Sequence, residues 1–197
     1  MQNRFRKSRT GVGSRRPAVN ALPRARELRA VFLVGFMGAG KTTVGQALGR
    51  RLGLPFEDLD DRIQHREGKT IEQIFHDSGE AEFRRAESAA LRALLEELGS
   101  SVRVVALGGG AFVQPGHAAL IEEAKVHSVF LDAPVDELLR RCEEEPAKRP
   151  LRQDAKQFRE LYQARRQSYM KAAIRIETAG KDVDTVAAEV ACSLGFG

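Results

Sequence analysis

Apolar residues along the chain gather in five short runs, separated by longer segments of mixed polarity. The runs are AVFLV (30–34), LPFEDLD (54–60), VRVVAL (102–107), HSVFLDA (127–133) and AIRIET (173–178). Short apolar runs bounded by polar loops are typical of strands that are buried on both faces of a parallel sheet. We therefore expect five strands, the second of them ending near Asp58.

The segments between these runs have helical periodicity. An apolar residue recurs on every turn of residues 41–52, which predicts a helix that begins at Lys41. Thr70 and Gln73 have the spacing of a capping box, which predicts a second helix start. A long helix is expected over about 80–98, and further helices over 134–145, 155–172 and 184–194.

Strands that alternate with helices favour parallel pairing through right-handed crossovers. We predict a doubly wound α/β fold on a five-stranded parallel sheet, with ligands bound outside the carboxyl ends of the strands. A chain of 197 residues has the length of a single domain with a full core.

Positive charge is concentrated near the N-terminus. Residues 1–30 contain nine Arg or Lys and one acid, a charge of +8, so residues 31–197 carry −3 of the total +5. We predict a basic, disordered tail over 1–28 and a folded domain over 29–197. The tail could contact nucleic acid, or it could be a solvated leader or the product of a mis-called start codon. We favour the second interpretation, so no nucleic-acid partner is expected.

Cysteine usage and hydropathy exclude several classes of protein. Cys142 and Cys192 lie far apart and belong to no CxxC or Cys/His cluster, which argues against a disulfide framework or a zinc site and favours a cytoplasmic location. No apolar run approaches the ~18 residues that a membrane-spanning helix needs, so no membrane partner is expected.

GFMGAGKTTVG, residues 35–45, lies between the first strand and the first helix. Its GxxxxGK[ST] spacing in this context is that of a Walker A loop, whose backbone N–H groups bind phosphate at a helix N-terminus. Lys41 is expected to reach the β- and γ-phosphates, and Thr42 to offer its hydroxyl to Mg²⁺. The loop residues predicted to bind ATP are Gly38, Ala39, Gly40, Lys41, Thr42 and Thr43.

The Walker A loop alone does not distinguish a GTPase, an ATPase and a small-molecule kinase. No NKxD guanine signature is present, and a compact domain leaves no room for the insertions of a motor or transporter ATPase. A small kinase fits these constraints.

Four further stretches follow the loop: FEDLDD (56–61), GEAEFRRAE (79–87), LGGGA (107–111) and the arginine-rich KRPLR (148–152) with YQARRQSY (162–169). In this order and spacing the chain resembles the shikimate kinase family over about residues 30–195. The resemblance implies a P-loop kinase of the nucleoside-monophosphate-kinase-like type, with a lid segment.

Asp58 follows the second strand, where a carboxylate suits a ligand of Mg²⁺ or of its waters. The resemblance implies that Asp60 holds the acceptor hydroxyls, and a carboxylate there could accept the proton of the attacking hydroxyl. The alternative for both acids is that they stabilise a helix N-terminus.

Arginine binds a carboxylate with two parallel hydrogen bonds, so it suits an acidic acceptor. The family match assigns this role to Arg84 and Arg165, and implies that Gly108, Gly109 and Gly110 approach the ring of the substrate. It also implies that Arg149 belongs to a lid that closes over the ATP phosphates, and that Arg141 stacks on adenine. The chain departs from the family pattern at Leu59, Asp61, Arg152 and Gln167.

The resemblance implies phosphorylation of the 3-hydroxyl of shikimate by ATP with Mg²⁺, giving shikimate 3-phosphate and ADP in chorismate biosynthesis, by a monomer. Catalysis would fall to Lys41, Asp60 and Arg149. Two alternatives remain: a kinase of another small hydroxy acid such as gluconate, and a non-catalytic ligand sensor with a nucleic-acid-binding tail.

Overall fold

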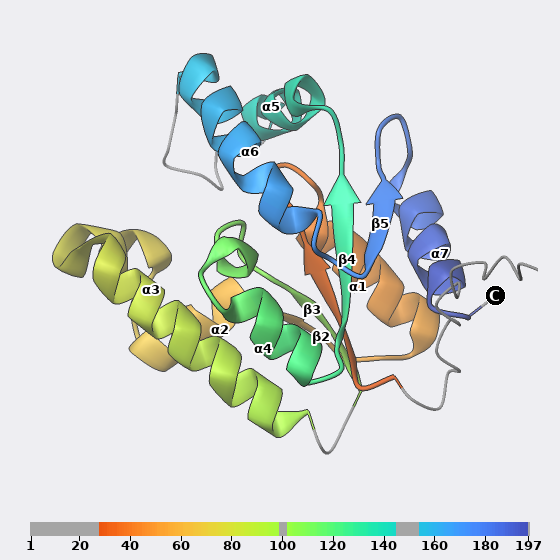
Figure 1. The fold of residues 1–197 in the computed structure, drawn as a ribbon, viewed down its shortest axis with the longest axis horizontal. Helices are drawn as coiled ribbons and strands as arrows, with labels where there is room; N and C mark the ends of the chain where they lie inside the picture. The colour runs from red at the N-terminus through yellow and green to blue at the C-terminus, as the bar shows by residue number, and fades with distance from the viewer. Residues whose placement is uncertain (1–27, 99–101, 145–153, 197) are drawn as a thin grey trace, which may run out of the picture.

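The computed structural model describes residues 28–98, 102–144 and 154–196. Its strands form one parallel sheet in the order β2-β3-β1-β4-β5 (Figure 1). Their bounds are β1 Ala30–Val34, β2 Phe56–Asp58, β3 Arg103–Ala106, β4 His127–Asp132 and β5 Ile174–Glu177. The five predicted strands and their parallel pairing are confirmed.

The central strand β1 explains why the apolar runs are continuous. It lies between β3 and β4, and each of its five residues is buried. Since helices cover both faces of the sheet, neither face of β1 can be polar without burying an unpaired group.

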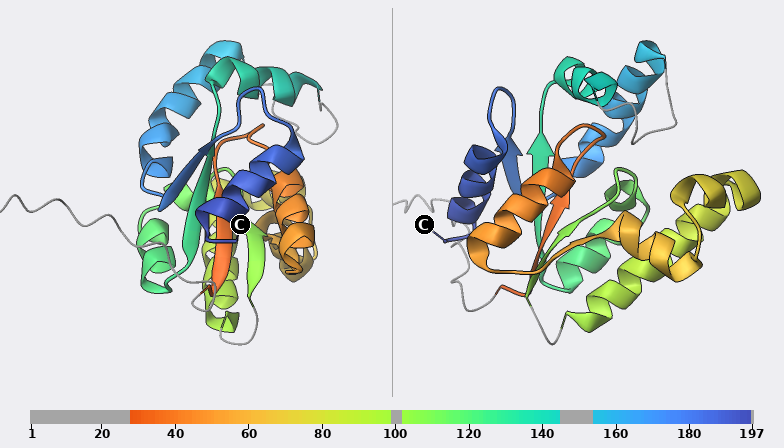
Figure 2. Two further views of the ribbon diagram at one scale, coloured as in Figure 1. Left: turned by 90° about the vertical axis from the view of Figure 1, so that its right-hand side faces the viewer. Right: turned by 180° about the vertical axis from the view of Figure 1, so that it is seen from behind.

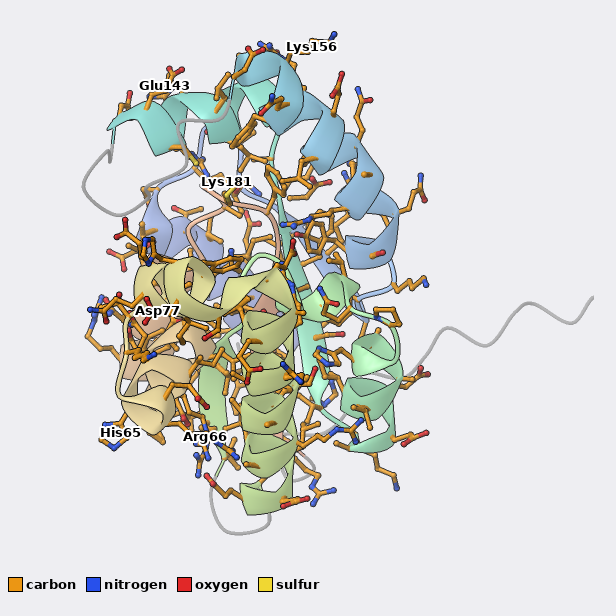
Figure 3. All side chains as sticks on the ribbon, turned by 90° about the vertical axis from the view of Figure 1, so that its left-hand side faces the viewer. His65, Arg66, Asp77, Glu143, Lys156 and Lys181 are labelled. Atoms are coloured by element: carbon orange, nitrogen blue, oxygen red, sulfur yellow. The ribbon has the colours of Figure 1, made fainter. Side chains whose placement is uncertain are left out.

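Helices form two layers around this sheet (Figures 1 and 2). One face is covered by α1 (Lys41–Leu52) and α7 (Val183–Ser193), the other by α3 (Ile71–Glu97) and α4 (His117–Glu123). The remaining helical elements are α2 (Leu59–Glu67), the 3₁₀ helix η2 (Ala111–Val113), α5 (Val135–Glu144) and α6 (Ala155–Tyr169). Polar side chains such as His65, Arg66 and Asp77 project outward (Figure 3).

Strand order determines where a ligand can bind. The connection from β1 to β2 crosses over β3 toward one edge of the sheet. The connection from β3 to β4 crosses over β1 toward the other edge. Such a reversal opens a crevice at the carboxyl end of the central strand. The loop at residues 35–40 emerges at this point.

Three short helical elements, α2, α4 and η2, are absent from the sequence-based prediction. Only two residues of α2, Leu59 and Ile63, are buried, so its apolar stripe is too weak to be recognised. The capping box of Thr70 and Gln73 is confirmed. The two predicted helices that follow it are joined at Gly79, whose φ of 77° and ψ of 177° break the helical path of α3.

Within the described ranges, no helix is both long enough and apolar enough to cross a membrane. The predicted tail falls outside these ranges except for Leu28, which is buried in the core.

Candidate active site

The phosphate-binding loop packs tightly against α5. At Gly38 the backbone has a φ of 79°, and a Cβ there would lie 2.5 Å from the Leu138 carbonyl oxygen. A side chain at this position would therefore be strained and would clash with α5. Lys41 Nζ donates to the carbonyl oxygens of Gly35 at 3.0 Å and Phe36 at 3.1 Å, which holds the ammonium group against the loop.

A cavity of about 840 Å³ opens next to the loop. It is lined by residues 38–43, by Asp58 and Asp60, and by Arg141. All the described residues that the sequence predicts to bind ATP thus border one cavity. Thr178 and Lys181, from the segment after β5, form another part of the wall.

Arg141 links three elements around this cavity. Its guanidinium donates to the Gly38 carbonyl oxygen at 3.4 Å and to the Thr178 carbonyl oxygen at 3.0 Å, and it pairs with Glu137 on its own helix. These bonds fix its position at the edge of the cavity and connect α5 to the phosphate-binding loop.

The two predicted metal ligands lie in contact. Thr42 Oγ1 donates to Asp58 Oδ2 at 2.8 Å, while Asp58 Oδ1 accepts from the Asp60 backbone N–H at 3.1 Å and caps α2. The alternative for Asp58, stabilisation of a helix N-terminus, is therefore confirmed, while its predicted role as a metal ligand stays a prediction. A hydroxyl beside a carboxylate matches the hard oxygen ligands of Mg²⁺.

Three of the predicted site side chains converge on the glycine run 108–110. A Cβ at Gly108 would lie 2.5 Å from Asp60 Oδ1, and one at Gly110 would lie 2.5 Å from Arg84 Nη1. Arg165 Nη1 donates to the Gly109 carbonyl oxygen at 3.3 Å. A side chain at 108 or 110 would require the Asp60 carboxylate or the Arg84 guanidinium to move from the position it has here.

Glu87 and Tyr169 belong to the same cluster and were missed as site residues. Glu87, only 1% exposed, accepts from Arg84 Nη1 through Oε2 at 3.0 Å, and its Oε1 has no hydrogen-bond partner among the described residues. Burial raises the pKa of Glu87, with Arg84 opposing the effect. Its position three residues after Arg84, on the same helical face, is the signal that could have identified it.

Tyr169 donates its hydroxyl to the Gly109 carbonyl oxygen. Burial raises its pKa to about 12, although the nearby charges of Arg165 and Arg84 act in the opposite direction. The phenol is therefore protonated at neutral pH and available as a donor, and it anchors the C-terminal end of α6 to the glycine run.

Departures from the family pattern lie mostly away from these contacts. Leu59 is fully buried in the core, Asp61 lines the cavity, and Gln167 is exposed on α6. Arg149 and Arg152 lie outside the described residues, so the predicted lid stays a prediction.

Comparison with known proteins places this arrangement in a family. The family model for shikimate kinase matches residues 37–194. A shikimate kinase of Geobacter sulfurreducens is 43% identical over 83% of this chain and 89% of its own. One from Persephonella marina is 36% identical over 83% of this chain and 97% of its own.

Solved structures agree with the sequence comparison. A shikimate kinase from Aquifex aeolicus has a TM-score of 0.74 at 35% identity, covering 84% of this chain and 96% of that one. One from Acinetobacter baumannii, solved in complex with shikimate, has a TM-score of 0.75 at 33% identity, covering 83% of this chain and 91% of that one. A gluconokinase from Sinorhizobium meliloti, at 16% identity and a TM-score of 0.53, shares the fold alone. The chain belongs to the shikimate kinase family.

Proposed function

We propose that this protein transfers the γ-phosphoryl group of ATP to the 3-hydroxyl of shikimate, giving shikimate 3-phosphate and ADP in chorismate biosynthesis. The observation that carries the proposal is the convergence of Asp60, Arg84 and Arg165 on one glycine run, beside a phosphate-binding loop, in a chain of this family. This arrangement supplies phosphate binding and carboxylate recognition side by side.

In the nucleotide site, residues 38–43 bind the phosphates through backbone N–H groups, and Lys41 neutralises charge on the β- and γ-phosphates. Arg141 borders the adenine. Thr42 and Asp58 would hold Mg²⁺, which when bound stabilises negative charge on the phosphates. The 2.8 Å contact between their oxygens supports this assignment, because both are hard ligands at one point.

In the acceptor site, Arg84 and Arg165 bind the shikimate carboxylate, and Asp60 orients the ring hydroxyls. The acceptor oxygen forms a bond to the γ-phosphorus as the bond to the β–γ bridging oxygen breaks. The hydroxyl proton passes to the Asp60 carboxylate. By family resemblance, Arg149 stabilises the charge of the transition state from a lid that excludes water.

Location and assembly also stay proposals. Cys142 and Cys192 form no disulfide, in keeping with a reducing cytoplasm. We propose a monomer, by family resemblance.

The proposal is tested by measuring ADP release from ATP and Mg²⁺ with shikimate, quinate, gluconate or no acceptor. We expect ADP with shikimate alone. Lys41→Met should abolish turnover while the protein still melts cooperatively, because the proposed task of the ammonium group is to neutralise phosphate charge. ADP release with gluconate alone would contradict the assigned acceptor, and near-native turnover of Lys41→Met would contradict the role of the loop.

A further inference from the structure

His117, the first residue of α4, is a buried histidine whose two ring nitrogens both have partners. It is 4% exposed; Nδ1 lies 2.8 Å from the Ala111 carbonyl oxygen, and Nε2 lies 2.9 Å from Ser88 Oγ. A carbonyl oxygen can only accept, so Nδ1 must carry the proton. Nε2 of the neutral ring then accepts from the Ser88 hydroxyl. Burial lowers the pKa of His117, which keeps this neutral tautomer.

Both partners adjoin the acceptor site. Ala111 directly follows Gly110, whose Cα lies against the Arg84 guanidinium. Ser88 directly follows Glu87, which accepts a hydrogen bond from the same guanidinium. His117 therefore connects the glycine run to the helix that carries Arg84, although its own side chain does not line the cavity beside the phosphate-binding loop.

We propose, resting on the function proposed above, that His117 is a positioning residue for recognition of the acceptor carboxylate. Its ring fixes the spacing between the glycine run and α3, and hence the place of the Arg84 guanidinium. The rigid imidazole suits this task because it offers a donor and an acceptor at a fixed separation, each satisfied by one wall of the site. Small errors in the placement of a binding group are costly, since bidentate arginine binding depends on geometry.

A purely structural role would have different consequences. A histidine that only anchored α4 would, when replaced, lower stability and affect both substrates alike. A positioning role predicts weaker shikimate binding with ADP binding and the chemical step little changed.

The test measures shikimate and ADP binding by calorimetry, together with KM, kcat and thermal melting. Ser88→Ala and His117→Leu each remove contacts of the ring, and we expect shikimate binding about tenfold weaker for His117→Leu. His117→Asn restores a donor near the Nδ1 position and should recover affinity to within about threefold of the native protein. His127→Leu is the matched control. His127 is another histidine and is partly buried, but it lies at the amino end of β4, whereas the candidate site lies at the carboxyl ends of the strands.

Unchanged shikimate affinity in a folded His117→Leu variant would overturn the inference, as would equal losses for shikimate and ADP. Should His117→Leu fail to fold, Ser88→Ala decides, because it removes a single hydroxyl from the same bridge: native shikimate affinity in that variant overturns the inference. If the native protein binds ADP but not shikimate, the proposed function itself fails, an outcome distinct from a failure of the variants.

Discussion

Arg84 is held between two carboxylates that differ greatly in exposure. The side chain of Glu80 is 68% exposed and that of Glu87 is 1% exposed, and both accept hydrogen bonds from the guanidinium at 3.0 Å. The exposed pair contributes little, because solvent screens it. The buried carboxylate fixes the orientation of Arg84, because a guanidinium that moved away would leave an unpaired buried charge.

Arg84→Ala should raise the KM for shikimate at least about 30-fold, since hydrogen bonds to a charged group are worth about 1.5–3 kcal/mol each. Its KM for ATP should change little. Arg85→Ala is the matched control, because Arg85 lies next in sequence but is 74% exposed and pairs with Glu82 on the surface. Steady-state kinetics with each substrate varied in turn decides the point. A larger effect on the KM for ATP than on the KM for shikimate would contradict the assignment of Arg84 to the acceptor site.

Glu87→Gln should change the pH dependence of stability. Burial raises the pKa of Glu87 above its ordinary value of 4.5, so the protonated form favours the folded state. That contribution is fully present below pH 4.5 and is lost as pH rises through the folded-state pKa. The stability of Glu87→Gln relative to the native protein should therefore increase as pH rises from 4 toward neutrality.

Urea unfolding of both proteins at several pH values measures this difference. A stability difference that stays constant with pH would contradict the raised pKa. Shikimate affinity of the variant should still fall at neutral pH, because the amide replaces a charged partner of Arg84.

At the scale of elements, Asp132 joins two strands and a helix. It ends β4 and is 4% exposed, and it accepts hydrogen bonds from Tyr162 and Arg166 of α6 and from Arg175 of β5. Tyr162 also donates to the Ala133 carbonyl oxygen at 3.2 Å. This cluster anchors α6, the helix that carries Arg165, to the carboxyl edge of the sheet.

Asp132→Ala should lower the free energy of unfolding by about 2 kcal/mol. Losing one partner of a fully buried pair costs about 3–5 kcal/mol, but Arg166 and Arg175 remain partly hydrated, which reduces the loss. Asp136→Ala is the control, because Asp136 is 74% exposed and pairs with Arg159, so at most about 1 kcal/mol is expected. Chemical denaturation measures the free energy of unfolding of both variants. If Asp132→Ala and Asp136→Ala lowered it equally, the cluster would not anchor α6.

At the scale of the whole molecule, the excess positive charge belongs to a different part of the sequence from the described core. The N-terminal 30 residues carry +8, whereas the rest of the chain carries −3. The described core begins at Leu28, whose side chain is buried, and Arg29 donates to the Ala124 carbonyl oxygen. The excess positive charge therefore lies outside the part of the chain that forms the active site.

Deleting residues 2–27 should leave kcat/KM for shikimate within about twofold of the native value, because the deletion stops short of Leu28. It should also leave the melting temperature nearly unchanged. Filter binding to duplex DNA at low and high salt tests the alternative role of the tail. Salt-sensitive binding by the full chain that vanishes on deletion would favour that alternative.

Features encoded by residues close together in the sequence were predicted, whereas contacts between distant residues were not. The strands, the Walker A loop and the capping box of Thr70 were predicted correctly, because each is encoded by residues adjacent along the chain. Weak local patterns hid α2 and α4. Arg84 and Arg165 were selected by family resemblance; their contact with one glycine run became visible only in the folded chain.

By itself, the sequence determined the fold class, the phosphate-binding loop and the family, since periodicity and motif spacing are local properties. The tertiary structure decided that Leu59 points into the core, that Glu87 is the buried partner of Arg84, and that His117 contacts both Ser88 of α3 and Ala111 after the glycine run. These facts depend on burial and on contacts between elements far apart in the chain. No local pattern encodes them, because a side chain acquires its partner and its desolvation only when the helices pack on the sheet.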